Sequence, residues 1–403
     1  MTPTSLTDRA PPTWRVFDRA EFDHRLAAVK YRMAADGIDV MLVSDPANMN
    51  YLTGYDGWSF YVPQVVIVAL EHDNPVWIGR HMDANGARWT TVLPPDDILG
   101  YPDHYVQQRH IHPMTFVAEE ITRRGWHKGR LAVEMDAYYF SVQGWESLRA
   151  GLPNATFKDA GHLVNWVRAV KSEAEIGLMR RAARILESAM QTACEGVEPG
   201  RRQCDTVAEI MSAQVRGTPE FGGDYTAIVP MLPTGICSST PHLTWTDETF
   251  KAGEATILEL AAANRRYHCA MARTVYLGKP PTLMVDTAEV VCEGLQAALD
   301  AARPGATCEE VEHAWREATR RHGLVKESRI GYSIGCAYPP DWGEHTMSLR
   351  PGDTTVLQPN MTFHLIPGIW MEDWGIELSE TFLVTERGGE PLCGLPRGLY
   401  VKQ

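Results

Sequence analysis

The chain has 403 residues and a formal net charge of -13. This length allows two domains with a large core, while the acidic balance argues against a nucleic-acid partner. No apolar run approaches the ~20 residues of a membrane span, and the charged N-terminus lacks the apolar stretch of a signal peptide.

Residues 1–165 alternate between helix and strand patterns. Four apolar residues between positions 22 and 33 have helical spacing, and Gly37 is placed to end that helix. Asp45-Pro46-Ala47-Asn48 predicts a turn. Three short apolar runs are typical of buried strands, at 40–43, 65–70 and 131–133. The alternation predicts an α/β domain.

Residues 166–403 contain the same layout twice. Ser172 and Glu175 predict a capping box that begins a helix ending near Gly196, and a second helix follows. About a hundred residues later, two further capping boxes are predicted, at Asp286/Glu289 and Thr307/Glu310. Each helix pair precedes a strand-rich block, 224–277 or 330–385. This order predicts an internal pseudo-repeat.

Five segments of the strand-rich blocks resemble, in order and spacing, the five ligand strands of the creatinase/methionine-aminopeptidase family. These segments are 257–260, 267–274, 331–335, 363–368 and 375–381. The resemblance implies a mixed α/β protein, with a creatinase-like N-terminal α/β domain (1–165) and a C-terminal duplicated α+β domain of the pita-bread fold (166–403).

The family's metallopeptidases place Asp, Asp, His, Glu and Glu at the ligand positions of these strands. The matching residues here are Glu259, Ala270, Tyr332, Ile366 and Ser379. A hard cation needs several carboxylate or imidazole ligands, and four of these five positions offer neither. We therefore expect no metal and no other cofactor, and we interpret Ala270 and Ser379 as spacers.

Strand alternation predicts which side chains share the site, because residues two apart lie on one face of a strand. Glu380 is expected to point to the other face. His242, in the segment 241–245, resembles the family histidine that lies over the reacting centre without binding metal. The predicted pocket comprises Glu259, His268, Tyr332, His364 and Glu377.

Glu259 lies in the apolar run 257–263, where a carboxylate must be paired or protonated. Such a residue is a candidate for function. A buried carboxylate with histidine and hydroxyl groups suits general acid–base work or nucleophilic attack. The matching substrate is already electrophilic, such as a protonated amidine or guanidine.

Longer and more specific runs resemble one group within the family, the ectoine hydrolases. They are 51–62, 101–107, 222–225, 227–235, 241–245, 266–268, 338–344 and 372–375. This resemblance implies opening of the cyclic amidine of ectoine, and of 5-hydroxyectoine, to an N-acetyl-diaminobutyrate. Glu259 would be the nucleophile or base, and His242 would carry the proton to the departing nitrogen. The residues expected to bind the substrate are Tyr332, His364, Glu377, His268, Asp224, Tyr338 and Trp342.

Three alternatives remain open from the sequence. The chain could hydrolyse another amidine, guanidine or lactam, it could be a metal-dependent Xaa-Pro peptidase despite the missing ligands, or it could be a non-catalytic pita-bread binding protein. The family resemblance also implies a homodimer. The eight cysteines form no CxxC pair, which predicts reduced thiols in a cytoplasmic protein.

Overall fold

The computed structural model describes residues 15–403 and divides the chain into two units, the first ending at Arg168 and the second spanning Ala169–Gln403. The sequence placed this boundary between residues 165 and 166. Residues 1–14, which include most of the segment used to predict the absence of a signal peptide, lie outside the described residues. Within the described range, none of the helices combines the length and apolar character that crossing a membrane requires.

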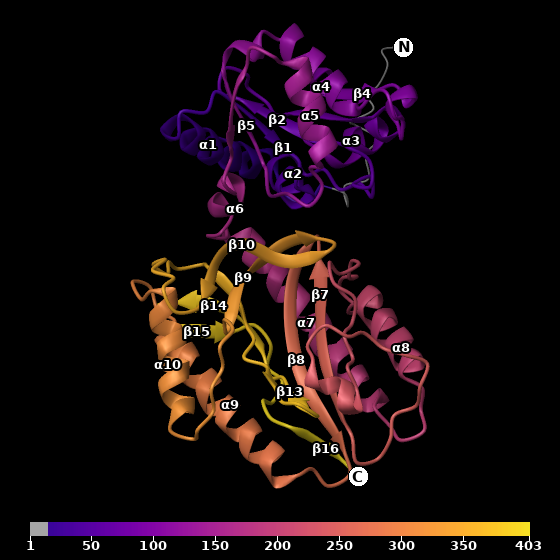
Figure 1. The fold of residues 1–403 in the computed structure, drawn as a ribbon, viewed down its shortest axis with the longest axis vertical. Helices are drawn as coiled ribbons and strands as arrows, with labels where there is room; N and C mark the ends of the chain where they lie inside the picture. Colours follow the sequence, from indigo (N-terminus) through magenta and orange to yellow (C-terminus); the bar gives the residue numbers. More distant parts are fainter. Residues whose placement is uncertain (1–14) are drawn as a thin grey trace. The chain divides into compact units, whose positions relative to one another are not determined.

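The first unit is built on a six-stranded sheet with the strand order β4-β3-β2-β1-β5-β6 (Figure 1). Its central strands are buried over their whole length, as expected for a sheet covered on both faces. The strands are β1 (Val40–Val43), β2 (Val65–Ala69), β3 (Val76–Arg80), β4 (Ile98–Tyr101), β5 (Arg130–Val133) and β6 (Thr156–Asp159). The helices are α1 (Arg19–Ala35), α2 (Pro46–Thr53), α3 (Ala84–Thr90), α4 (Pro113–Arg123), α5 (Val142–Gly151) and α6 (Leu163–Val167).

The predicted strands and first helix of this unit are confirmed, but the predicted turn at 45–48 is wrong. Asp45 is the N-cap of α2, and its carboxylate accepts hydrogen bonds from the backbone N–H groups of Ala47 and Asn48. Pro46 occupies the first helical turn, where a missing N–H costs nothing. The same residues favour a turn and a helix start, and here the helix forms.

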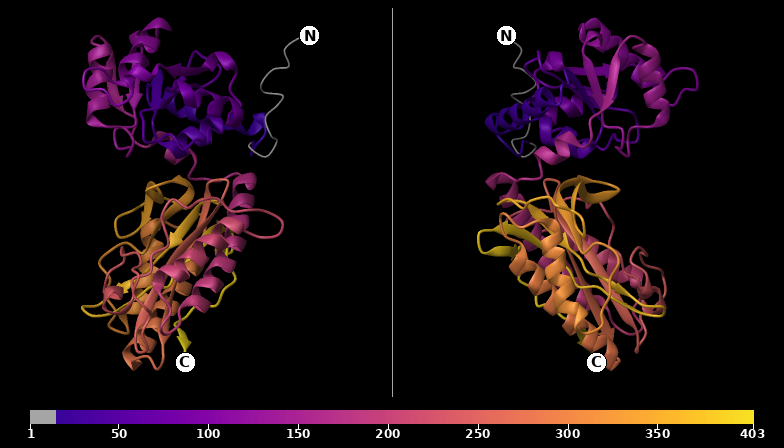
Figure 2. Two further views of the ribbon diagram at one scale, coloured as in Figure 1. Left: turned by 90° about the vertical axis from the view of Figure 1, so that its right-hand side faces the viewer. Right: turned by 60° about the vertical axis from the view of Figure 1, so that its left-hand side comes forward.

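The second unit contains the predicted repeat of a helix pair followed by strands (Figures 1 and 2). The first half comprises α7 (Glu173–Gly196), α8 (Gln203–Arg216), β7 (Ala255–Asn264) and β8 (Tyr267–Leu277). The second half comprises α9 (Thr282–Ala301), α10 (Cys308–Arg320), β9 (Gly331–Tyr338), β10 (Asp341–Leu349), β11 (Thr362–Leu365), β12 (Ile369–Trp370), β13 (Gly375–Ile376), β14 (Glu380–Thr385), β15 (Gly388–Pro391) and β16 (Tyr400–Lys402).

Strands of both halves join in one eight-stranded sheet. Its main path is β15-β14-β11-β9-β8-β16, with β10 paired to β9 and β7 paired to β8. Helix α7 packs against β7 and β8, while α9 and α10 contact strands of the second half. The arrangement is the duplicated α+β fold that the sequence predicted.

The capping boxes explain where two of the four helices begin. Ser172/Glu175 and Thr307/Glu310 each exchange the expected pair of hydrogen bonds. The predicted box at Asp286/Glu289 is wrong, because α9 already begins at Thr282 and places Asp286 inside the helix.

The hairpin between β7 and β8 sets the register of the central strands. Arg265 and Arg266 have φ values of 53° and 69°, as a two-residue type I′ turn requires. The Asp224 carboxylate accepts a hydrogen bond from Arg266 N at 3.1 Å and supports this turn. In the resulting register, Glu259 lies opposite Ala272.

Candidate active site

Sheet register brings four of the five predicted pocket residues together. Glu259 is paired with Ala272, whose N–H donates to Ser379 Oγ at 2.6 Å. His364 is paired with Tyr332 across β11 and β9. Glu377 follows β13, and its N–H donates to Thr274 Oγ1 on β8 at 2.9 Å. The predicted common face of these strands is therefore present in the structure.

A continuous hydrogen-bonded chain crosses this face. Trp342 Nε1 donates to the Tyr332 hydroxyl at 2.8 Å, and that hydroxyl lies 3.0 Å from His364 Nδ1. On the other side of the imidazole, Nε2 lies 2.8 Å from Ser379 Oγ. His364 is fully buried, and burial lowers its pKa to about 3, with the nearby positive charge of Arg329 acting in the same direction. The imidazole is therefore neutral at physiological pH.

Ser379 is a member of this chain, so its interpretation as a spacer is wrong. Its hydroxyl contacts both His364 Nε2 and Ala272 N. Ala270 contributes only backbone, since its N–H and C=O both bond to the Thr381 hydroxyl. Glu380 points to the opposite face, as predicted, and there pairs with the buried Arg273 at 2.7 Å.

Two buried carboxyl groups provide the acidity of the site. Burial, followed by the charges of Glu377 and Asp341, raises the pKa of Glu259 well above its ordinary value. Burial also raises the pKa of Glu377 to about 8, although the charge of Lys326 opposes this shift. Within residues 15–403, no hydrogen bond or ion pair reaches the Glu259 carboxyl, and Glu377 Oε2 has no hydrogen-bond partner. Both acids therefore favour their protonated forms until a cation arrives.

Three charged residues lie around these acids, and two of them, Lys326 and Arg329, were not assigned to the site from the sequence. Lys326 Nζ donates to Ser328 Oγ and Gly368 O, each at 2.8 Å, and burial lowers its pKa to about 8. Arg329 lies over the ring of Tyr332, 4.5 Å from its centre. Asp341 accepts a hydrogen bond from Gly343 N at 2.9 Å and contacts His345. Lys326 and Arg329 come from an irregular loop, where strand periodicity gives no signal.

Three predicted substrate-binding residues have other contacts. His268 lies four residues from Ala272 along β8, and its ring nitrogens contact Ala227 N and Arg266 O, each at 2.9 Å. Burial lowers its pKa to about 4. Tyr338 is buried beside the Arg266 guanidinium, 5.5 Å from its ring centre. Asp224 supports the β7–β8 turn. Their roles in substrate binding stay predictions.

His242 is exposed on the loop between the 3₁₀ turn η7 (Gly235–Ser239) and β7. The described part of the chain offers its side chain no hydrogen bond or ion pair, and its charge is not among the influences on Glu259. The structure therefore does not bring His242 into the chain of contacts around the two acids.

The side chains at the five positions that match the family's metal ligands do not fit the metal centre of the metallopeptidases. Among residues 15–403, no three His, Cys, Asp or Glu side chains are grouped so that they could hold a metal ion. Ala270 and Ile366 bring apolar side chains to two ligand positions, while Tyr332 and Ser379 are joined to His364 at two others.

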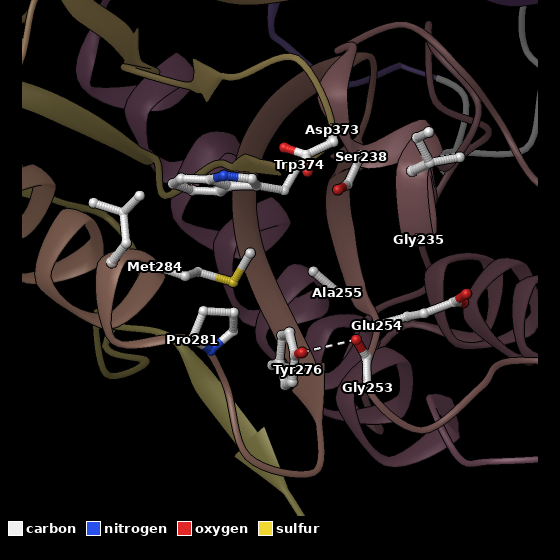
Figure 3. Close-up of a pocket in the computed structure, with 12 residues that line it drawn as sticks. Gly235, Ser238, Gly253, Glu254, Ala255, Tyr276, Pro281, Met284, Asp373 and Trp374 are labelled. Carbon is white, nitrogen blue, oxygen red and sulfur yellow. Dashed lines mark hydrogen bonds between the residues drawn. The ribbon is translucent and has the colours of Figure 1, made fainter.

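A cavity of about 290 Å³ lies near the start of β7 (Figure 3). Trp374 and Asp373 form one part of its wall, and Pro281 and Met284 form another. Tyr276 donates to Gly253 O at 2.7 Å at its base. Because Trp374 is three residues before Glu377 and Ala255 is four before Glu259, the cavity borders both segments that carry the acids.

The fold and this site define a pita-bread domain preceded by an α/β domain. Comparison with known families agrees: residues 177–386 match the metallopeptidase family M24, and residues 25–170 match the creatinase/prolidase N-terminal domain. The chain belongs to this creatinase/prolidase family.

Related proteins align with nearly the whole length of this chain. An ectoine hydrolase from Halomonas elongata is 50% identical over 96% of this chain and 98% of its own. The protein y4tM of Sinorhizobium fredii, an uncharacterised hydrolase/peptidase, is 46% identical over the same shares. The crystal structure of dipeptidase PepE from Mycobacterium ulcerans has a TM-score of 0.79 at 20% identity and covers 96% of this chain and 99% of its own, which shows the shared fold. The close relationship to a hydrolase over the full length makes this chain an enzyme.

Proposed function

We propose that this enzyme hydrolyses the cyclic amidine of ectoine, and of 5-hydroxyectoine, without a metal ion. The observation that carries the proposal is the pair of buried acids, Glu259 and Glu377, whose pKa values are both raised by burial. The half-identical ectoine hydrolase of Halomonas elongata supports the choice of substrate.

A cationic substrate would change the ionisation of the site. Burial and mutual repulsion disfavour two negative charges at Glu259 and Glu377. A bound amidinium supplies a positive charge, which lowers the pKa of a neighbouring carboxyl group. The substrate itself would therefore generate the Glu259 carboxylate next to the electrophilic amidine carbon. A neutral peptide bond would not have this effect.

Glu259 would then attack the amidine carbon directly or remove a proton from a water molecule that attacks it. In either case one C–N bond of the ring breaks, the departing nitrogen takes a proton, and the product is an N-acetyl-diaminobutyrate. The direct route leaves a covalent adduct on Glu259 that water must release. Mass measurement of acid-quenched enzyme during turnover separates the two routes.

The proton for the departing nitrogen has two candidate sources. The sequence predicts His242, which lies on an exposed loop. Glu377 is buried and, with a pKa of about 8, still holds its proton at neutral pH. His242→Ala and Glu377→Gln, each measured for turnover over a range of pH, distinguish them, because only loss of the true donor removes the alkaline limb of the profile.

Metal independence is supported by the chemistry of the side chains present. A catalytic divalent ion would require several carboxylate or imidazole ligands. On this face, His364 already contacts Tyr332 and Ser379 through both ring nitrogens. Of the five ligand positions of the family's peptidases, Glu259 alone offers a carboxylate, and Glu377 lies outside these positions.

The test uses Glu259→Gln, which keeps the shape of the side chain and removes its charge. Wild-type enzyme treated with EDTA should release the ring-opened acetyl product from ectoine, followed by NMR, while Glu259→Gln should lose on the order of 10³-fold or more in turnover. Glu372→Gln is the matched control, because Glu372 is an exposed carboxylate on a neighbouring segment. Normal turnover by Glu259→Gln would refute the assignment. Loss of wild-type activity on EDTA treatment, restored by a divalent ion, would refute metal independence.

A related amidine, guanidine or lactam is the alternative substrate, since the acid pair would accept any compact cation. Parallel assays with creatine and with ectoine separate these classes. A purely protein-binding role is opposed by the two buried acids, because a binding surface gains nothing from uncompensated carboxyl groups in its core.

We further propose a cytoplasmic homodimer that does not bind nucleic acid or membranes. All eight cysteines are free thiols in the structure, which is compatible with a reducing compartment. The net charge of -13 disfavours association with nucleic acid. Light scattering coupled to gel filtration would test the dimer directly.

A further inference from the structure

We infer that Arg329 is the receptor for the carboxylate of the substrate; this inference rests on the proposed function. Ectoine is a zwitterion, with a carboxylate on the ring carbon next to one amidine nitrogen. A site with only acids would bind the amidinium and repel the carboxylate. Specific recognition therefore requires a cation close to the acid pair, and the structure offers two candidates, Lys326 and Arg329.

Two of the three N–H donors of Lys326 are already used by the protein. Its Nζ bonds to Ser328 Oγ and Gly368 O, each at 2.8 Å, and it lies 4.7 Å from the centre of the Trp370 ring. A substrate carboxylate would have to compete with these contacts. Lys326 is better explained as the charge that opposes the raised pKa of Glu377.

Arg329 retains most of its donors. In the described part of the chain, its guanidinium makes one hydrogen bond, from Nη1 to Ser348 Oγ at 3.0 Å, and lies on the face of Tyr332. The side chain is exposed, and no carboxylate of the described residues forms an ion pair with it, although its charge contributes to the lowered pKa of Asp341. A guanidinium held flat by an aromatic ring keeps a planar fork of N–H groups that suits a carboxylate.

Arg329 and Glu259 share one neighbour, Tyr332. The negative charge of Glu259 and the positive charge of Arg329 both act on Tyr332, the first raising its pKa and the second lowering it. Tyr332 is therefore close to both the carboxyl of Glu259 and the guanidinium of Arg329. A small zwitterion that places its amidinium at Glu259 would point its carboxylate across Tyr332 towards Arg329.

Steady-state kinetics on two ligands test this assignment. The first ligand is ectoine, and the second is methyl-tetrahydropyrimidine, the same ring without the carboxylate, measured as a substrate or as a competitive inhibitor. Arg329→Gln should raise KM for ectoine by about 10- to 100-fold with little change in kcat. It should leave the affinity for the ring without a carboxylate unchanged. Arg329→Lys should recover part of the loss, because a point charge replaces the fork.

Arg320→Gln is the matched control, since Arg320 is an exposed arginine on α10 that pairs with Glu317 at 3.2 Å. Arg320→Gln also removes one positive charge, and it should leave both the KM for ectoine and the affinity for the ring without a carboxylate unchanged. Equal losses for both ligands in Arg329→Gln, or an unchanged KM for ectoine, would overturn the inference and leave the proposed function intact. Failure of the wild-type enzyme to open the ring of ectoine would instead overturn the proposed function and this inference together.

Discussion

Replacing Glu377 by Gln should stabilise the fold at alkaline pH and have little effect at acidic pH. In the folded protein the pKa of Glu377 is about 8 instead of its ordinary 4.5, because the carboxyl is buried. The unfolded chain therefore ionises first as the pH rises. A carboxyl with a raised pKa contributes stability below pH 4.5, and this contribution is lost as the pH rises towards 8.

The size of the effect follows from the difference between the two pKa values. Between pH 5 and pH 8.5, linkage gives a loss of folding free energy on the order of 4 kcal/mol from this one group. Glu377→Gln cannot ionise, so it should avoid that loss. Nearby Lys326, whose pKa burial lowers to about 8, regains on the order of 1 kcal/mol near the upper end of this range, because the unfolded chain keeps that proton to higher pH, and so offsets only part of the loss.

Urea denaturation at the two pH values measures the difference. The midpoint of wild-type unfolding should fall more steeply with pH than that of Glu377→Gln, by roughly 1 M urea or more. The first unit is identical in both proteins, so its unfolding contributes equally to the two denaturation curves. Glu372→Gln, at an exposed carboxylate, should follow the wild type. If wild type and Glu377→Gln showed the same pH dependence, Glu377 would not be a buried acid with a raised pKa.

Two further substitutions test the supports of the site. Tyr332→Phe leaves Trp342 Nε1 and His364 Nδ1 without their shared partner, and should lower the free energy of unfolding by about 1–3 kcal/mol; an unchanged urea midpoint would contradict the hydrogen-bonded chain. Arg273→Met leaves Glu380 as a buried carboxyl without its main partner and should lower the free energy of unfolding by about 3–5 kcal/mol. Adding Glu380→Gln to this variant should recover part of the loss in the same denaturation assay. Strictly additive losses in that pair would show that the two side chains do not interact.

The sequence predicts the fold well where one physical rule dominates. Period-two alternation places Glu259, Tyr332, His364 and Glu377 on one face, because a strand allows only two directions for its side chains. The capping boxes at Ser172 and Thr307 are confirmed, because their reciprocal hydrogen bonds need only local geometry. The same rule fails at Asp286, because α9 begins at Thr282 after the N-cap Pro281, without a side-chain cap, and Asp286 lies inside the helix.

The parts of the site that the sequence did not reveal depend on contacts between distant segments. Lys326 and Arg329 come from a loop without periodicity, and their proximity to Glu377 and Tyr332 follows from the path of the chain into β9. Ser379 stands at a ligand position of the family's metallopeptidases but offers no metal ligand, so the resemblance predicts only a spacer there. Its contact with His364 depends on the register of β11 and β14, which no local pattern encodes.

The hydrogen bonds of His364 determine whether the imidazole on the same face as the two acids carries a charge. If Tyr332 donates to Nδ1, then Nε2–H donates to Ser379 Oγ, which already accepts from Ala272, and the serine proton is left over. If the imidazole has the other tautomer, the tyrosine proton is left over instead, because Tyr332 then accepts from both Trp342 and His364. Either arrangement satisfies the imidazole and keeps it neutral, as its lowered pKa requires. The sheet thus fills the centre of the site with neutral groups and leaves the two acids uncompensated from that side. Among the described residues, positive charge reaches this face from Lys326, whose charge opposes the raised pKa of Glu377, and from Arg329, which lies over the ring of Tyr332. Under the proposed function, the amidinium of the substrate would bring a further positive charge to the two acids.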